Sequence, residues 1–303
     1  MSLIKEILED TKKSIIEHQS KTPLAALQDL ARSSSPTRSF VNALHTNGFT
    51  IIGEIKRHSP SLKFMNPHNV KKAIGVYRQH SIISAVSVLT NEKHFHGSVE
   101  DLQKYRLQID KPIMRKDFII DEYQVYEARA LGADAILLMT SIHLSNPKLF
   151  SDLYDLAISL DLQPLIEVGM INDKSDIQKQ VKMIPNDAQV VGINSRQFGS
   201  TSFQFRRHFS PFMKKDLTVS RNLHHELIEV VDKIPHKGNR IFVAESGVHN
   251  AEDIQSLHNA GYSAALIGTA FLYGPKDIED VVKGFEAISY QSQQPHYVSR
   301  LAS

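Results

Sequence analysis

Residues 122–139, with the sequence EYQVYEARALGADAILLM, carry the pattern that decides the fold of this chain. Residues 122–131 have apolar side chains at three- and four-residue spacing, which predicts an amphipathic helix. Gly132 follows at the position where a left-handed residue commonly ends a helix. Residues 133–139 then form an almost continuously apolar run, which is typical of a strand buried on both faces. The stretch therefore predicts a helix that returns the chain to a buried strand.

The same alternation extends in both directions. Short apolar runs that predict strands occur at residues 49–55, 82–89, 112–114, 133–139, 163–168, 189–193, 240–244 and 263–267. Helical patterns separate several of them, at residues 122–131, 146–160, 223–234 and 251–260. Strict alternation predicts an α/β fold with a parallel sheet, and eight units favour a closed (β/α)8 TIM barrel. The alternative, an open doubly wound sheet, usually has a Gly-rich turn after its first strand. Here that strand is followed by KRHSP at residues 56–60.

The barrel is expected to occupy residues 49–290, between two shorter segments. Residues 1–48 predict an N-terminal helical extension, because the apolar residues at positions 4, 7, 8 and 15 fall on one helical face. Two positions are open to this extension: it packs on the bottom of the barrel, or it folds over the mouth. Residues 291–303 are polar and are expected to form a frayed C-terminal tail.

The composition argues against several classes of protein. The chain has 35 Lys and Arg against 33 Asp and Glu, a formal net charge of +2, so no basic excess indicates nucleic-acid binding. It has no cysteine, which excludes disulfides, thiolate metal sites and a cysteine nucleophile. No apolar run approaches the roughly 18 residues that span a membrane, and the N-terminus lacks the apolar core of a signal peptide. We therefore expect a cytoplasmic protein that binds neither membranes nor nucleic acid.

Charged side chains gather where the predicted strands end. Glu54 and Lys56 end the first strand and are two residues apart, so they point to the same side. Lys116, Glu167 and Asn194 stand at the ends of the third, fifth and sixth strands. Barrel enzymes carry their catalytic groups at this edge, although a structural ion pair also explains any single buried charge. The convergence of two lysines and three glutamates on one edge predicts an active site.

Small residues follow the last two strands. The seventh strand is followed by Glu245-Ser246-Gly247 and the eighth by Gly268-Thr269. Such residues let backbone N–H groups approach an anion, and a short helix over residues 269–273 would direct its N-terminus to the same place. The ends of strands seven and eight are the usual phosphate site of such barrels. The pair therefore predicts a site for a phosphorylated small molecule, with tight turns alone as the alternative.

Several motifs resemble those of the indole-3-glycerol-phosphate synthase family, in order from residue 49 to residue 272. The longest are IGEIKRHSPS at residues 52–61 and MRKDFIIDEYQ at residues 114–124. Shorter ones, LIEV at 165–168, GINSR at 192–196 and AESG at 244–247, fall on later strand ends. The resemblance implies a carboxy-lyase of tryptophan biosynthesis that needs no cofactor and no metal. Its substrate would be 1-(2-carboxyphenylamino)-1-deoxyribulose 5-phosphate, and its products indole-3-glycerol phosphate, carbon dioxide and water.

The resemblance also implies roles for individual residues. Lys116 would be the general acid of ring closure, and Glu167 the base of the later dehydration, with Glu54 as its rival. Lys56 would bind the substrate carboxylate or help the dehydration as an acid. The remaining implied residues are Asn194 in the catalytic set, Arg196, Ser246 and Ser59 in substrate binding, Gly247, Gly268 and Thr269 in phosphate binding, and Phe95, Phe118 and Leu137 around the anthranilate ring.

Departures from the family pattern leave competing interpretations open. Leu62-Lys63 stand where the family usually has Lys-Gly, and residues 199–218 form a longer segment than usual, interpreted as a solvated loop or as a lid. Another phosphosugar barrel, such as phosphoribosylanthranilate isomerase, is a second interpretation, which the lysines of strands one and three argue against. A non-catalytic paralogue that binds a phosphorylated ligand is a third, although Lys116 and Glu167 are both present. We expect a monomer or a weak homo-oligomer.

Overall fold

The chain forms a closed barrel of eight parallel strands. The computed structural model describes residues 3–45, 48–60, 63–169, 174–195, 224, 228–229 and 240–292. The strand order is β1-β10-β9-β8-β7-β6-β5-β4, and β1 pairs with both β10 and β4. This closure confirms the (β/α)8 barrel and excludes an open sheet, whose edge strands would lack a neighbour. The following lie outside the described residues: Leu62, Arg196, residues 199–218, most of the helix predicted over 223–234, and residues 293–303 of the predicted tail.

The elements follow one another as the alternation predicts. The barrel strands are β1 (Thr50–Ile55), β4 (Ile83–Leu89), β5 (Ile113–Lys116), β6 (Ala135–Met139), β7 (Gln163–Gly169), β8 (Val190–Asn194), β9 (Ile241–Glu245) and β10 (Ala264–Ile267). A hairpin of β2 (His58–Ser59) and β3 (Lys63–Phe64) follows β1. The helices are α1 (Leu3–Lys21), α2 (Leu24–Ser33), α3 (Phe40–Leu44), α4 (Pro67–Gln79), α5 (Glu92–Phe95), α6 (Glu100–Arg106), α7 (Glu122–Ala130), the 3-10 helix η1 (Thr140–His143), α8 (Pro147–Ser159), α9 (Lys174–Val181), α12 (Ala251–Asn259), α13 (Thr269–Leu272) and α14 (Ile278–Ser292).

Local signals in the sequence set the ends of these helices. Asn250 caps α12 in a capping box with Asp253, which satisfies N–H groups that the first turn leaves unpaired. Gly132 (φ +84°) and Gly261 (φ +98°) are left-handed after α7 and α12, as predicted for residues that end a helix. The strand predicted over residues 112–114 is longer than expected, because β5 continues to pair with β4 as far as Lys116.

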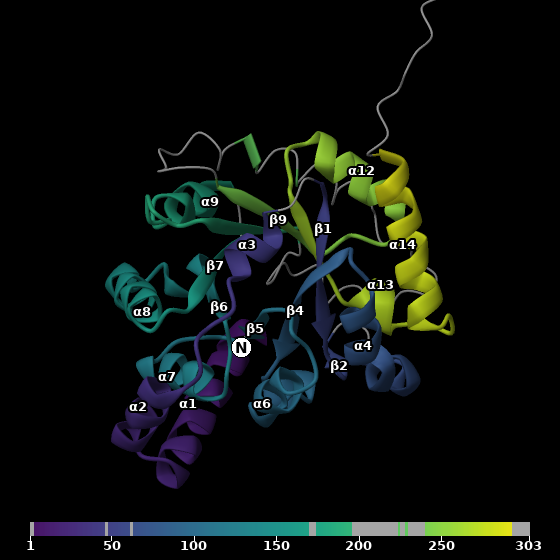
Figure 1. Cartoon of the computed structure of the whole chain (residues 1–303). Coiled ribbons are helices and arrows are strands. Elements are labelled where there is room, and N and C mark those ends of the chain that lie inside the picture. Colours follow the sequence, from purple (N-terminus) through teal and green to yellow (C-terminus); the bar gives the residue numbers. More distant parts are fainter. Residues whose placement is uncertain are drawn as a thin grey trace, which may run out of the picture.

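Two buried apolar clusters hold the barrel together. One lies between the strands and the surrounding helices and contains residues such as Ile51 and Ile136. The other fills the barrel interior with residues such as Ile52 and Leu137. Successive strand residues point to opposite faces, so each strand contributes to both clusters and is buried along its length. Figure 1 shows the strands in the centre with the helices arranged around them.

The N-terminal helices contact both ends of the barrel. The backbone N–H of Val41, in α3, donates to the side chain of Gln163 at 2.8 Å. Gln163 is the first residue of β7, so α3 lies at the N-terminal ends of the strands. Ile7, in α1, is fully buried in the interior cluster together with Phe118, which lies just beyond the end of β5. Of the two positions predicted for the extension, α3 thus takes the bottom of the barrel and α1 takes the mouth. Figure 1 shows α1 and α2 beside α7.

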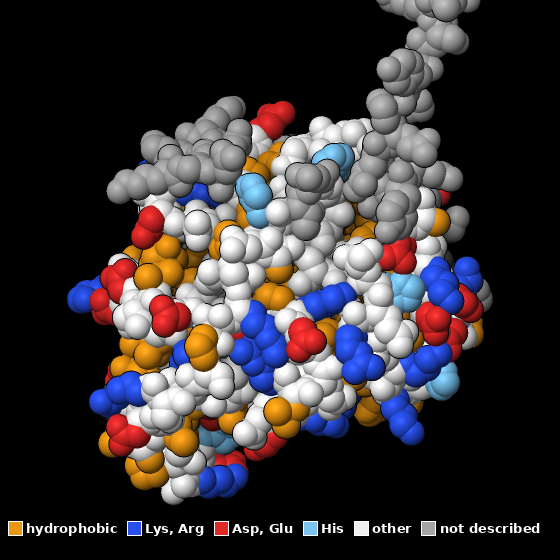
Figure 2. Space-filling view, viewed as in Figure 1, with side chains coloured by type: hydrophobic (Ala, Val, Ile, Leu, Met, Phe, Trp, Pro, Cys, Tyr) orange, Lys and Arg blue, Asp and Glu red, His pale blue; other side chains and the backbone are white. Residues whose placement is uncertain are grey.

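The surface carries charges of both signs. On the face in Figure 2, Lys and Arg side chains are interspersed with Asp and Glu. This mixture agrees with the near-balanced composition and its formal net charge of +2. Within the part of the chain that the structure describes, no helix combines the length and the apolar character needed to cross a membrane.

Candidate active site

A pocket lies at the C-terminal ends of the barrel strands. It is lined by side chains at or beyond the ends of the barrel strands, together with Phe95 of α5. All the residues predicted for the site line this pocket except Ser59 and Arg196, and Arg196 lies outside the described residues. Parallel strands bring their C-terminal ends to one edge, so residues that are distant in the sequence share this pocket.

Lys116 stands at the centre of the charged part of the pocket. Its Nζ lies 2.7 Å from Oε2 of Glu245 and 3.9 Å from Oε2 of Glu167. The two glutamate side chains are 1% and 3% exposed. Carboxylates so buried are stable only when charges or hydrogen bonds compensate their lost hydration. Lys116 provides the charge, and Asn194 donates from Nδ2 to Oε1 of Glu167 at 3.2 Å.

Burial and pairing shift the protonation equilibria of this cluster. Burial opposes the charge of Lys116, but the surrounding carboxylates, Glu245 foremost, outweigh it and raise the lysine pKa above its usual value. Burial, and next the carboxylate of Glu245, raises the pKa of Glu167 to about 8, against the lowering effect of Lys116. Lys116 therefore stays charged near neutral pH, whereas Glu167 takes up a proton readily.

Glu54 and Lys56 form a second ion pair in the pocket. Nζ of Lys56 donates to Oε1 of Glu54, and also to Oγ1 of Thr269 at 3.3 Å. The contact confirms that the two-residue spacing places both side chains on the same side of the chain. A Cβ at Gly268 would clash with Oε1 of Glu54. The glycine after β10 is therefore needed for the close approach of Glu54, a reason that the sequence alone does not reveal.

The backbone after β9 makes an unusual turn. Ser246 (φ +66°) and Gly247 (φ +79°) are both left-handed, which is uncommon for a residue with a side chain. Both residues line the pocket, as do Gly268 and Thr269 after the neighbouring strand β10. Turns of this kind direct successive backbone N–H groups to one side and form a concave site for an anion.

Apolar side chains form another wall of the pocket. The rings of Phe95 and Phe118 have centroids 6.4 Å apart and planes inclined at 32°. Phe118 and Leu137 are buried, and all three residues line the pocket. The pocket thus presents apolar surface beside its charged groups, as many ligand sites do.

The structure separates one predicted residue from the pocket and adds others. Ser59 is fully buried in β2, where it pairs with Lys63 of β3, and it does not line the pocket. Glu245 has no role assigned from the sequence, yet it is the nearer of the two carboxylates that contact Lys116. Its position at a strand end was the available signal. His249 also lines the pocket, from a loop in which no periodic pattern indicates the direction of a side chain.

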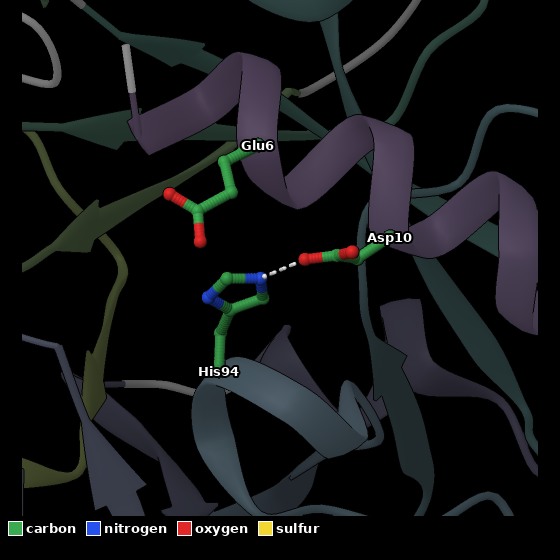
Figure 3. Close-up of side chains that lie close together, drawn as sticks. All are labelled: Glu6, Asp10 and His94. Carbon is green, nitrogen blue, oxygen red and sulfur yellow. Dashed lines mark hydrogen bonds and ion pairs between the residues drawn. The ribbon is translucent and has the colours of Figure 1, made fainter. Parts of the chain in front are cut away.

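A cluster of titratable side chains links α1 to α5. Figure 3 shows Glu6 and Asp10, one turn apart on α1, facing His94, whose Nε2 lies 3.0 Å from Oδ2 of Asp10. The three residues are close enough to share a metal ion. However, the Lys93 ammonium already lies 2.8 Å from the same Asp10 oxygen, and it lowers the pKa of Asp10 to about 2. The cluster therefore joins α1 to α5, the short helix that ends at Phe95, through an ion pair.

Sequence comparison distinguishes between the possible barrel enzymes. The family model described as Indole-3-glycerol phosphate synthase matches residues 4–284. The chain belongs to the indole-3-glycerol phosphate synthase family. The indole-3-glycerol phosphate synthase of Lachnospira eligens is 36% identical over 284 residues, which cover 93% of this chain and 96% of that protein. The indole-3-glycerol phosphate synthase of Streptomyces griseus is 33% identical over 275 residues, which cover 90% and 91%.

Structural comparison supports the fold of this indole-3-glycerol phosphate synthase family member. The structure of 3-hexulose-6-phosphate synthase from Salmonella typhimurium aligns with a TM-score of 0.52 and 10% identity, over 80% of this chain and 99% of that chain. At this identity the likeness concerns the barrel alone. The family match begins within α1 and ends within α14, so the N-terminal helices belong to the pattern of the indole-3-glycerol phosphate synthase family.

Proposed function

We propose that this chain converts 1-(2-carboxyphenylamino)-1-deoxyribulose 5-phosphate into indole-3-glycerol phosphate, carbon dioxide and water. The ring carbon that bears the carboxylate attacks the ribulose carbonyl, the carboxylate leaves as carbon dioxide, and loss of water completes the indole. The observation that carries the proposal is the position of Lys116, in contact with both Glu245 and Glu167. A positioned acid beside a positioned base is what ring closure followed by dehydration requires.

Lys116 is the proposed acid of ring closure. As the carbonyl oxygen becomes an alkoxide, the ammonium stabilises the growing charge and supplies a proton. The carboxylates that raise the pKa of Lys116 keep it protonated in the free enzyme. The alkoxide is a far stronger base and takes the proton as the carbon–carbon bond forms. Glu245, 2.7 Å from the ammonium, is proposed to orient this acid.

Glu167 is the proposed base of the dehydration. With a pKa raised to about 8, its carboxylate accepts a proton more readily than an ordinary glutamate, which suits a base that works near neutral pH. Asn194 holds one of its oxygens. The rival base, Glu54, is engaged by the ammonium of Lys56, and this pairing favours Glu167.

The substrate phosphate is proposed to bind at the corner between the ends of β9 and β10. The left-handed turn at Ser246 and Gly247 supports this assignment, together with Gly268 and Thr269 on the adjacent strand end. Lys56 lies 3.3 Å from the Thr269 hydroxyl, so its ammonium adds positive charge near this corner. Charged donors bind phosphate oxygens more strongly than neutral ones do.

The anthranilate ring is proposed to lie against Phe95, Phe118 and Leu137. Their apolar surface adjoins the charged groups in one pocket, so a ring held there has its carboxylate side near the lysines. Aromatic side chains bind a flat ring through offset or edge contacts. Substrate binding by Arg196 and Ser59 stays a prediction from the family resemblance.

A rate assay with the synthetic substrate tests the function. The indole product fluoresces, and the chain itself has no tryptophan, so the signal is cleanly read. We expect turnover without added cofactor, and the same rate after dialysis against a chelator. Lys116→Met, shown to be folded by circular dichroism, is the matched inactive control. Substrate binding without turnover by the wild type would favour the non-catalytic paralogue, and turnover of phosphoribosylanthranilate would favour the isomerase.

We also propose a cytoplasmic enzyme that works as a monomer or a weak homo-oligomer. The absence of cysteine is compatible with a reducing compartment. Within the chain, residues 1–48 are proposed as the extension, 49–290 as the catalytic barrel and 291–303 as a tail. Sedimentation at several protein concentrations measures association, and limited proteolysis tests the boundaries.

A further inference from the structure

Ser246 adopts a conformation that its own residue type does not favour. A φ of +66° brings the Cβ of an L-residue close to its neighbouring backbone, a cost that glycine avoids. Such a conformation persists only where surrounding contacts hold it. Ser246 stands between Glu245, which pairs with Lys116, and Gly247, which lines the pocket. Glu245 is held in β9 by its pairing with β8 and β10, so a change of the backbone at Ser246 would move Gly247 rather than Glu245.

Two side chains converge on the carbonyl oxygen of Ser246. Nε2 of His224 lies 3.2 Å from it, and Oγ of Ser195 lies 3.4 Å from it. A carbonyl oxygen only accepts hydrogen bonds, so Nε2 of His224 must carry the hydrogen. His224 is 2% exposed, and a buried hydrogen bond is costly to leave unmade.

Tyr262 holds the other side of the His224 ring. Its hydroxyl lies 3.3 Å from Nδ1 and 3.0 Å from the His224 carbonyl oxygen, and the two rings meet edge to face. The Tyr262 hydroxyl has one hydrogen to donate. When it donates to Nδ1, the neutral ring carries its own hydrogen on Nε2; when it donates to the His224 carbonyl oxygen, the charged ring carries hydrogens on both nitrogens, so Nε2 can donate to Ser246 in either arrangement. Tyr262 belongs to the cluster between strands and helices. Contacts in this cluster, rather than contacts in the pocket, therefore fix the direction of the Nε2–H group.

We propose that His224 is a positioning residue that holds the Ser246–Gly247 turn in the shape that binds the substrate phosphate. The inference rests on the phosphate site proposed above. His224 does not line the pocket, so it acts through the backbone of the turn. Without its hydrogen bond, Ser246 relaxes towards a more favourable backbone conformation, and the N–H groups of the turn lose their common direction. Phosphate affinity falls more than the rate of ring closure, which depends on Lys116.

A matched pair of variants isolates this hydrogen bond. His224→Gln and His224→Asn both carry an amide and differ by one methylene. The longer side chain places its Nε2 where the imidazole Nε2 stood, whereas the shorter one meets Tyr262 but does not reach Ser246. We expect His224→Asn to raise both KM and the inhibition constant of inorganic phosphate about tenfold, equivalent to about 1.4 kcal/mol. His224→Gln should keep both within about threefold of the wild type, and kcat should change by less than about threefold in either variant.

Ile228→Ala is the control for general destabilisation. Ile228 is buried beside Gly261, where its Cδ1 would lie 3.5 Å from an added Cβ. Its truncation removes apolar contacts beside Gly261, the residue that precedes Tyr262. It removes no hydrogen bond to the turn at Ser246 and Gly247. Thermal unfolding should therefore shift down in this variant, while KM and the phosphate inhibition constant stay as in the wild type.

The outcomes distinguish a failure of the proposed phosphate site from a failure of the positioning role of His224. If inorganic phosphate does not compete with substrate in the wild type, the phosphate site itself is wrong and the role of His224 is lost with it. If phosphate competes in the wild type but binds His224→Asn and His224→Gln equally well, only the positioning role is overturned. An equal rise in the phosphate inhibition constant for Ile228→Ala would likewise overturn it, because loss of stability would then explain the effect.

Discussion

Replacing Glu245 by glutamine should lower the pKa of Glu167 and move the acid limb of the pH–rate profile. The amide keeps the shape of the side chain and removes its charge. Glu245 and Glu167 approach the same ammonium, at 2.7 and 3.9 Å, so about 7 Å or less separates two like charges that repel each other. After burial, this carboxylate is the largest cause of the raised pKa of Glu167.

Coulomb's law gives the size of the shift. Two unit charges about 7 Å apart, at an effective dielectric constant of about 20, repel by about 2.4 kcal/mol. That energy corresponds to about 1.7 pKa units. Because about 7 Å is an upper limit for the separation, this energy is a lower limit, and the pKa of Glu167 should fall from about 8 to about 6 or lower. Because a base must be ionised, kcat/KM rises with pH through this pKa. Between about pH 6 and pH 9 the rise should be about a hundredfold in the wild type and about tenfold or less in the variant.

The profile is measured from initial rates of product fluorescence at substrate concentrations far below KM. Loss of the Glu245 carboxylate, which pairs with Lys116, will lower the rate at every pH. The readout is therefore the pH at which the acid limb lies, and not the size of the rate. Glu127→Gln is the matched control, because this buried glutamate pairs with Arg115 and His18 outside the pocket. An acid limb that stays in place in Glu245→Gln would refute the assignment of Glu167 as the titrating base. An equal shift in the control would trace the effect to a general change.

Four further changes test the other assignments. Lys116→Met should lower kcat by at least about a hundredfold with little change in KM, as expected for a positioned acid, whereas Lys56→Met should raise KM as well; steady-state kinetics that show the loss of kcat only for Lys56→Met would reverse the two roles. Gly268→Asp should raise KM sharply, because its Cβ would clash with Oε1 of Glu54 and its charge would repel phosphate; a KM near the wild-type value would count against a phosphate site at this corner. A short Gly-Ser bridge in place of residues 199–218 should leave kcat within about a factor of three, since loop length costs little stability, and a hundredfold loss with the fold intact would make the segment a lid.

Strand order, fold class and the edge that carries the site were predictable from the sequence. Apolar runs and helical spacing report burial along a short stretch of chain, and glycines such as Gly132 mark where a helix ends. In a parallel barrel every strand ends on the same edge. Lys116, Glu167 and Asn194 could therefore be assigned to one pocket by counting strands, without any knowledge of their contacts.

The pairing of the charged groups depended on the closed barrel. Glu54 meets Gly268 because β1 joins β10 when the sheet closes. Lys116 and Glu245 belong to β5 and β9, which are not neighbours in the barrel, so their contact crosses the interior. A sequence pattern states that each side chain points inward, but the distance across the barrel sets which charges meet and hence which pKa is raised.

The turn at Ser246 and the position of the N-terminal helices were likewise decided by tertiary contacts. Serine has no preference for positive φ, and its conformation here is held by His224, which is distant in the sequence. The apolar face of residues 4–15 predicted a helix that packs, yet not that α1 would reach the mouth while α3 covers the other end. Local patterns record what each segment buries. Which group contacts a buried side chain depends on distances that exist only once the whole chain has folded.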